Sequence, residues 1–109
     1  MTTIKQEDLI QSIADALQFI SYYHPTDFIR AMRGAWEREE SAAAKAALTQ
    51  VLVNSKLCAI GKRPICQDTG IVNVLISVGM DVRWDAELAL EDMINEGVRR
   101  GYTHPDNVL

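Results

Sequence analysis

Apolar residues in the first part of the chain recur at three- and four-residue steps, which is the spacing of one face of an α-helix. The members of this stripe are Leu9, Ile10, Ile13, Leu17 and Ile20. Thr3 and Gln6 have the spacing of a capping box ahead of the stripe. Pro25 ends the helix, because a proline donates no hydrogen bond and disfavours helical geometry in the residue before it. We therefore expect a first helix that ends ahead of Pro25.

Two further helices are predicted between Pro25 and Gly61. Thr26 is placed to cap a helix whose inner face carries four apolar residues, Phe28, Ile29, Met32 and Trp36. Ser41 is placed to cap the next helix, which starts with an alanine-rich run at 42–47 of strong intrinsic helix preference. Gly61 is a natural stop for this helix, because glycine adopts the left-handed conformation without steric cost.

The periodicity changes after Gly70. Residues 71–78 form a short, β-branched and continuously apolar run, which is typical of a buried strand, and 82–84 are expected to form a short returning strand after a turn. Asp85 is placed to cap a last helix that Gly101 ends. The pattern predicts an α+β fold, mainly helical with about four helices, and one small strand or hairpin element after the loop that contains Cys66.

Composition limits the class of protein to which the chain can belong. The 109 residues are 48% hydrophobic and 24% charged, which is typical of a folded soluble domain, here a single domain over residues 1–109. The net charge of -4 and the lack of a basic cluster disfavour a nucleic-acid partner. No apolar run approaches the roughly 20 residues of a membrane span, and no signal-peptide core is present. We expect a cytoplasmic protein without a membrane partner.

Cys58 and Cys66 are the two cysteines, and a pair is too few for a disulfide framework. In a reducing cytosol they are expected to be free thiols or metal ligands. Two thiols without nearby histidines cannot complete a tetrahedral zinc site. A structural role as a small buried hydrophobic residue is the alternative for each of them, and for Cys58 it is the one we expect.

Residues 65–70, with the sequence Ile-Cys-Gln-Asp-Thr-Gly, place a thiol, an amide, a carboxylate, a hydroxyl and a glycine next to one another. A cysteine thiolate is a soft ligand that suits iron–sulfur clusters. The neighbouring amide of Gln67 and carboxylate of Asp68 can hold or protonate a small oxygen-rich ligand. Without Cys66, the Asp-Thr-Gly sequence is an ordinary turn, so the functional interpretation depends on this cysteine.

This loop, with the Lys-Arg-Pro sequence at 62–64 before it and residues 71–85 after it, resembles the N-terminal region of class I fumarate hydratases. These are iron–sulfur enzymes, and they share this region with the α subunit of L-tartrate dehydratase. The similarity extends to residues 18–25 and covers the whole chain, although only the Cys-Gln-Asp-Thr-Gly core is specific.

The resemblance implies a hydro-lyase that interconverts (S)-malate and fumarate with a [4Fe–4S] cluster held by three cysteines. It implies that Cys66 is one cluster ligand and that Gln67 and Asp68 contact the substrate. Asp68 is also the candidate catalytic residue, as the proton donor to the leaving hydroxyl. Gly70 is expected to let the loop backbone approach the substrate closely.

The resemblance leaves the cluster incomplete, because only Cys66 lies in a matching motif. The chain ends on apolar Val108 and Leu109 without a polar tail, so we expect it to be the N-terminal part of a longer hydro-lyase. By itself it is expected to be inactive. The expected partners are a small dicarboxylate substrate, the rest of the same enzyme or a second subunit, and a further copy in a homo-oligomer.

Two alternatives stay open. The first is an L-tartrate dehydratase α subunit, because nothing in 109 residues distinguishes a second hydroxyl from a hydrogen on the substrate. The second is a non-catalytic helical module that binds a protein partner through the apolar faces of its helices.

Overall fold

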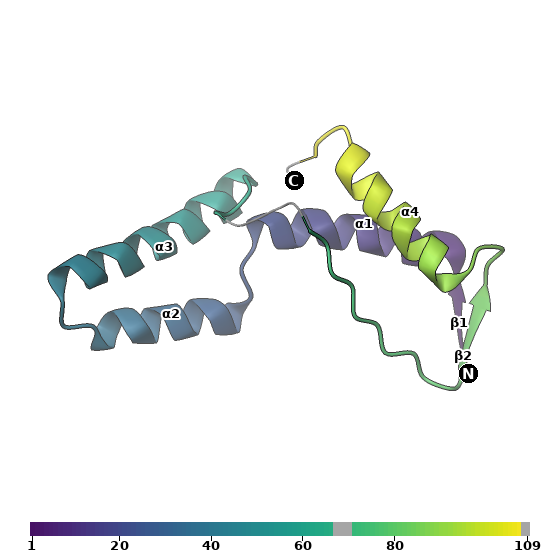
Figure 1. The fold of residues 1–109 in the computed structure, drawn as a ribbon, viewed down its shortest axis with the longest axis horizontal. Coiled ribbons are helices and arrows are strands. Elements are labelled where there is room, and N and C mark those ends of the chain that lie inside the picture. The colour runs from purple at the N-terminus through teal and green to yellow at the C-terminus, as the bar shows by residue number, and fades with distance from the viewer. Residues whose placement is uncertain (67–70, 108–109) are drawn as a thin grey trace. The chain divides into compact units, whose positions relative to one another are not determined.

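The computed structural model describes residues 1–66 and 71–107, and within these it has the mainly helical α+β architecture that the sequence predicts (Figure 1). The elements follow one another in the order β1 (Thr2–Lys5), α1 (Gln6–Tyr22), α2 (Thr26–Arg38), α3 (Ala42–Gly61), β2 (Val82–Asp85) and α4 (Leu90–Thr103). The prediction of about four helices and a small strand element after the Cys66 loop is confirmed.

The described residues divide into two compact units. Residues 1–19 and 71–107 form the first unit, which holds the sheet and α4, and residues 20–66 form the second unit, which holds α2 and α3. The helix α1 contributes to both.

The sheet consists of two parallel strands, and its register pairs Thr2 with Val82 and Lys5 with Asp85. The expected strand at 82–84 is therefore confirmed, but its partner is the N-terminal segment, which the sequence analysis did not assign to a strand. Because the strands are parallel, the element is not a hairpin. The N-terminal segment is too short to show a periodic pattern, so only its pairing with β2 identifies it as a strand.

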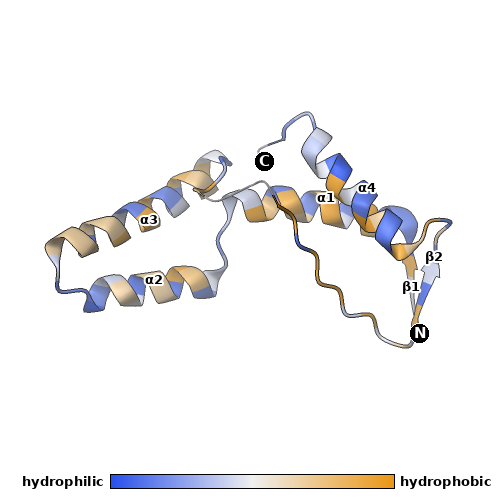
Figure 2. Ribbon diagram, viewed as in Figure 1, coloured by the Kyte–Doolittle hydropathy of each residue, from blue (hydrophilic) through white to orange (hydrophobic). Residues whose placement is uncertain are grey.

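The predicted buried strand at 71–78 is wrong for the described part of the chain. These residues lie in no strand and are mostly exposed, although Figure 2 shows the run largely in the colours of hydrophobic residues. A strand requires hydrogen bonds from a neighbouring strand, and among the described residues the sheet consists of β1 and β2 alone. An apolar, β-branched composition favours a strand, but it does not by itself supply a neighbouring strand.

The core of the first unit lies between α1 and α4. Ile10 and Met93 are each only 1% exposed, and Ala14 and Leu17 extend this buried stripe along α1. Gly97 brings the backbones into close contact, because a Cβ at this position would lie 2.7 Å from the Cβ of Ile13 and 2.9 Å from the carbonyl oxygen of Ile10. The predicted apolar stripe of the first helix thus packs against small residues of the last one.

Ion pairs and a polar cap reinforce the contact between α1 and α4. The guanidinium of Arg100 on α4 binds the carboxylate of Glu7 on α1, and it also donates from Nε to Glu96 at 3.1 Å. At the other end of the interface, Gln18 Nε2 donates to the carbonyl oxygen of Gly101 at 2.7 Å. This bond satisfies a carbonyl in the last turn of α4, where helical partners run out.

The second unit is built on a helical hairpin of α2 and α3. Ser41 caps α3 as predicted, since its hydroxyl accepts from the Ala44 N–H at 3.4 Å. Trp36 of α2 donates from Nε1 to the Thr49 hydroxyl of α3 at 2.8 Å, and the Lys45 ammonium lies 4.1 Å from the centre of its ring. The predicted inner face of α2 is only half-buried in the described structure.

Several predicted helix boundaries are wrong by a few residues. The residues that were expected to cap or end a helix make other contacts in the folded chain. Gln6 does not form a capping box, since its Oε1 accepts from the N–H groups of Glu87 and Leu88 at 3.0 Å. Asp85 ends β2, and α4 begins only at Leu90. Gly101 does not end α4, which continues to Thr103 because Gly101 serves the contact with Leu17 instead.

None of the helices in residues 1–66 and 71–107 is long and apolar enough to cross a bilayer.

Gly97→Ala tests the close contact of α1 and α4. Alanine normally stabilises a helix interior by about 1 kcal/mol relative to glycine, but here we expect a loss of about 1–3 kcal/mol because the new methyl group overlaps the Ile10 carbonyl and the Ile13 side chain. Chemical denaturation monitored by circular dichroism measures the change. Gly34→Ala on α2 is the matched control, because its Cβ meets only the flexible Arg38 guanidinium. Equal stabilisation by both substitutions would contradict the packing argument.

Glu96→Gln tests the charge cluster on α4. Hydrogen bonds from Arg99 and then Arg100 lower the pKa of Glu96 from 4.5 to about 2. Because the folded pKa is the lower one, the ionised carboxylate stabilises the fold above pH 4.5, and this contribution is lost as the pH falls towards 2. We expect the variant to have a lower melting temperature than the unmodified chain at pH 7. Its melting temperature should also fall less steeply between pH 4.5 and pH 2. Glu37→Gln is the control, because it removes only an exposed ion pair with Arg33. This substitution should not make the fall of the melting temperature at acid pH less steep.

Candidate functional site

The Cys66 loop begins where α3 ends. Lys62 follows the helix in the left-handed conformation, with a φ of 48°, and the N–H of Arg63 donates back to the carbonyl oxygen of Cys58 at 3.0 Å. This is the helix-end geometry that was expected at Gly61, displaced by one residue. The turn reverses the chain direction, so that the following residues run back along the second unit.

The loop is fixed by one buried side chain and one backbone hydrogen bond. Ile65 is 5% exposed, and its N–H donates to the carbonyl oxygen of Ser21 at 2.8 Å. Ser21 itself is completely buried, so this bond forms away from competing water. The residue directly before Cys66 is therefore held firmly in the second unit.

Cys66 lies exposed after this anchor, and its N–H donates to the side-chain oxygen of Asn54 on α3 at 3.4 Å. An accessible thiol on a fixed backbone can reach a ligand from outside the second unit. Cys66 is therefore not sealed inside the hydrophobic interior.

Cys58 is the opposite case. It is 4% exposed, and its Sγ donates to the carbonyl oxygen of Pro64 at 3.5 Å. The expectation that Cys58 is a core residue is confirmed. Its thiol supports the loop from inside while Cys66 faces out, so the two cysteines have different roles.

The other three predicted site residues, Gln67, Asp68 and Gly70, lie outside the described residues. Their position relative to Cys66 stays a prediction. Among the described residues, Cys66 is bonded to Asn54, and the preceding Ile65 is bonded to Ser21; neither contact was predicted from the sequence. Asn54 and Cys58 are four residues apart, and so lie on one face of α3, which is a signal that could have found Asn54.

His24 was also missed as a positioning residue of the second unit. Its Nδ1 lies 3.0 Å from the hydroxyl of Ser55, and its ring stacks on Phe28 with 4.3 Å between the centroids. Ser55 is nearly buried and lies one turn before Cys58 on α3. This side-chain contact joins the chain between α1 and α2 to α3.

Within residues 1–66 and 71–107, no group of three histidine, cysteine or acidic side chains converges on a point where a metal ion would sit. Cys66 supplies one accessible thiolate donor, which fits one ligand position of an iron–sulfur cluster.

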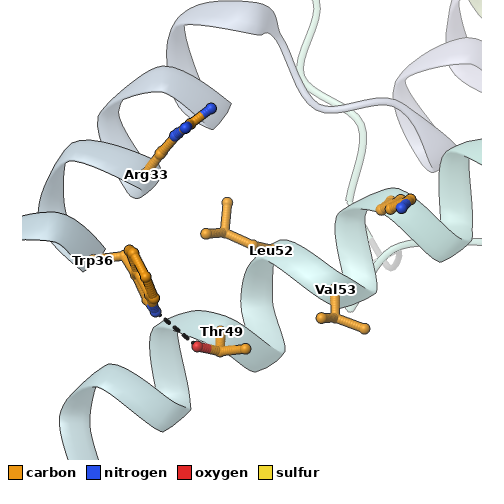
Figure 3. A pocket seen from close by; sticks show the side chains of 6 residues that line it. Arg33, Trp36, Thr49, Leu52 and Val53 are labelled. Carbon is orange, nitrogen blue, oxygen red and sulfur yellow. Dashed lines mark hydrogen bonds between the residues drawn. The ribbon is translucent and has the colours of Figure 1, made fainter. Parts of the chain in front are cut away.

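A separate groove of about 330 Å³ lies between α2 and α3, and Figure 3 shows Trp36 and Leu52 at its walls. It is lined by Arg33, Trp36, Thr49, Leu52, Val53 and Lys56. It contains none of the residues that the sequence analysis singled out for chemistry, and no acid or nucleophilic thiol lines it. The groove is therefore a feature of hairpin packing, and the Cys66 loop stays the candidate site.

Comparison with known proteins gives two findings. The family model described as fumarate hydratase (Fumerase) matches residues 10–108, which includes the Cys66 loop. A protein of Methanocaldococcus jannaschii, provisionally named L(+)-tartrate dehydratase subunit alpha, is 26% identical over 88 residues. The match covers 81% of this chain and 31% of that relative, so the chain spans about a third of the relative's length. No solved structure matches the chain significantly.

The two cysteines should differ strongly in their reactivity with a thiol reagent such as Ellman's reagent. In a Cys58→Ser variant the exposed Cys66 should react at once. In a Cys66→Ser variant the buried Cys58 should react at least about 100-fold more slowly, because its modification requires a local opening of the second unit. Both thiols should react at equal rates in denaturant. A native Cys66 that resisted the reagent would contradict the exposed position of the site.

Proposed function

Because the chain belongs to the fumarate hydratase (Fumerase) family, we propose that it forms the N-terminal part of an iron–sulfur hydro-lyase. The observation that carries this proposal is the family match over residues 10–108, which runs through the Cys66 loop. The geometry of the second unit supports it, because the loop presents an accessible thiol on an anchored backbone.

Cys66 is the proposed protein ligand of a [4Fe–4S] cluster. Its exposure and the two hydrogen bonds at Ile65 and Cys66 suit a ligand that must hold its position while it binds a group from outside the unit. Cys58 is not part of the ligand set, because it is buried and directed to the Pro64 carbonyl. The remaining cysteine ligands then come from outside these 109 residues.

Loss of water from a hydroxy acid needs help at the departing hydroxyl, because hydroxide is a poor leaving group. The bound cluster supplies a Lewis-acidic iron for that oxygen. Asp68 is proposed to donate a proton to the leaving hydroxyl, and Gln67 to donate a hydrogen bond to a substrate carboxylate without adding charge. Gly70 lets the backbone come close to the substrate, since it has no side chain.

Interconversion of (S)-malate and fumarate is the proposed reaction, in accord with the family description. Dehydration of tartrate is the second candidate, and the provisional name of the M. jannaschii relative favours it. The two reactions differ by one hydroxyl on the substrate, so the same loop chemistry serves both.

The proposed parent protein supplies what this chain lacks. The matched relative extends well beyond the shared region and is named as a subunit, so we propose that the rest of the same enzyme or a second subunit completes the site. The 109 residues alone are then inactive. We also propose a cytoplasmic location, since cluster-binding thiols must stay reduced.

The full-length protein encoded by the gene tests this function after anaerobic reconstitution with iron and sulfide. We expect a brown protein that hydrates fumarate, and a Cys66→Ser variant that loses iron and turnover. Cys58→Ser is the matched control and should keep its iron, because Cys58 is a core residue. Asp68→Asn should keep the cluster but lower kcat by about 10²–10⁴-fold, the range for loss of a general acid.

The outcomes separate the candidates. A Cys66→Ser protein with full cluster and turnover would refute the assignment. A preference for tartrate over malate would select the second reaction. A gene that encodes only these 109 residues, with no iron bound under any condition, would favour the non-catalytic interaction module.

A further inference from the structure

Two side chains of α3 hold the loop that carries Cys66. The Sγ atom of Cys58 donates to the carbonyl oxygen of Pro64 at 3.5 Å. The side-chain oxygen of Asn54 accepts from the Cys66 N–H at 3.4 Å. Cys58 and Asn54 are four residues apart and so lie on one face of the helix. This face of α3 therefore contacts the loop at two points, Pro64 and Cys66.

The bond between Cys66 and Asn54 differs from the other contacts of the loop in the residue that it holds. The backbone bond of Ile65 and the thiol of Cys58 hold the residues before Cys66. The Asn54 side chain instead bonds the backbone of Cys66 itself. A cysteine sulfur is joined to the backbone through one rotatable bond, between Cα and Cβ, so the position of the backbone limits the places that the sulfur can occupy. The contact with Asn54 therefore acts directly on the placement of the thiol.

The amide of Asn54 has the chemistry that this contact needs. The residue is half-buried, so water competes for its side chain less strongly than on an open surface. The amide oxygen accepts from the Cys66 N–H without a charge, whereas a carboxylate would place a negative charge beside a thiolate ligand. An aspartate side chain offers the same acceptor, and a leucine of similar size offers none. Substitution can therefore separate the effect of the hydrogen bond from that of side-chain size.

We propose that Asn54 is a positioning residue for Cys66, which fixes the backbone of the cluster ligand and thereby slows the loss of iron from the cluster. This inference rests on the proposed function, because it takes Cys66 as a ligand. Hydrogen-bonded partners that orient a metal ligand typically contribute about 10–100-fold to metal affinity. The bond to Asn54, at 3.4 Å, is longer than the usual length of roughly 2.7–3.2 Å. We therefore expect an effect near the lower end of that range, about tenfold.

Hydrogen exchange of the Cys66 amide tests the contact in the absence of a cluster. The full-length protein encoded by the gene is prepared without iron and with isotope-labelled cysteine, and a Cys66→Ser variant identifies the Cys66 signal in NMR spectra. In Asn54→Leu the amide should exchange about fivefold faster, because it loses its acceptor. In Asn54→Asp it should exchange as slowly as in the unmodified protein, because a carboxylate oxygen still accepts the bond.

Iron release from the reconstituted full-length protein tests the consequence for the cluster. Asn54→Leu should release iron to a chelator about tenfold faster than the unmodified protein, and Asn54→Asp should restore slow release. Gln50→Leu is the matched control, because it removes an exposed amide one turn earlier on α3 and should leave iron release unchanged. Since leucine favours a helix, both leucine variants should keep the helical circular dichroism. A difference in iron release between them then reports the contact with Cys66 and not the fold.

The outcomes distinguish this inference from the proposed function. An unmodified protein that binds no cluster would refute the proposed function, and this inference with it. If the unmodified protein binds the cluster, an Asn54→Leu variant with unchanged amide exchange or unchanged iron release would overturn the positioning role and leave the hydro-lyase assignment standing. Equal loss of iron from Asn54→Leu and Asn54→Asp would also overturn it, because the acceptor would then make no difference.

Discussion

The backbones of α1 and α4 approach each other directly in the first unit. This approach is possible only because Gly97 has no side chain, since a methyl group there would overlap Ile13 and the Ile10 carbonyl. The same approach brings Gln18 to the last turn of α4, where its amide bonds the Gly101 carbonyl. A helix-end carbonyl that lacks a helical partner is thereby satisfied by a distant side chain. The close approach of α1 and α4 therefore allows both the packing at Gly97 and the hydrogen bond from Gln18 to the Gly101 carbonyl.

In the second unit, buried polar groups hold the residues that precede Cys66. The carbonyl of the fully buried Ser21 receives the N–H of Ile65, and the buried thiol of Cys58 supports Pro64 from inside. Little water competes for these contacts. Their consequence is that the next side chain, Cys66, is exposed on a fixed backbone. A thiol in that position is available to chemistry that the unit itself does not contain, in keeping with membership of an iron–sulfur hydro-lyase family.

The fold holds the Cys66 loop and the segment 71–78 differently. The Cys66 loop needs a precise backbone, which the left-handed turn at Lys62 and the bond to Ser21 provide. The segment 71–78 lies in no strand of the described chain, whose sheet consists of β1 and β2.

The sequence by itself determined the helices and the Ser41 cap, because helical periodicity and capping are local properties. Only the tertiary structure decided that β1 is the partner of β2, and that Gln6 bonds the chain near residue 87 instead of capping its own helix. It also decided that Cys58 is buried and Cys66 exposed. Each of these outcomes depends on contacts between residues that are separated along the chain, and a local sequence pattern does not predict such contacts.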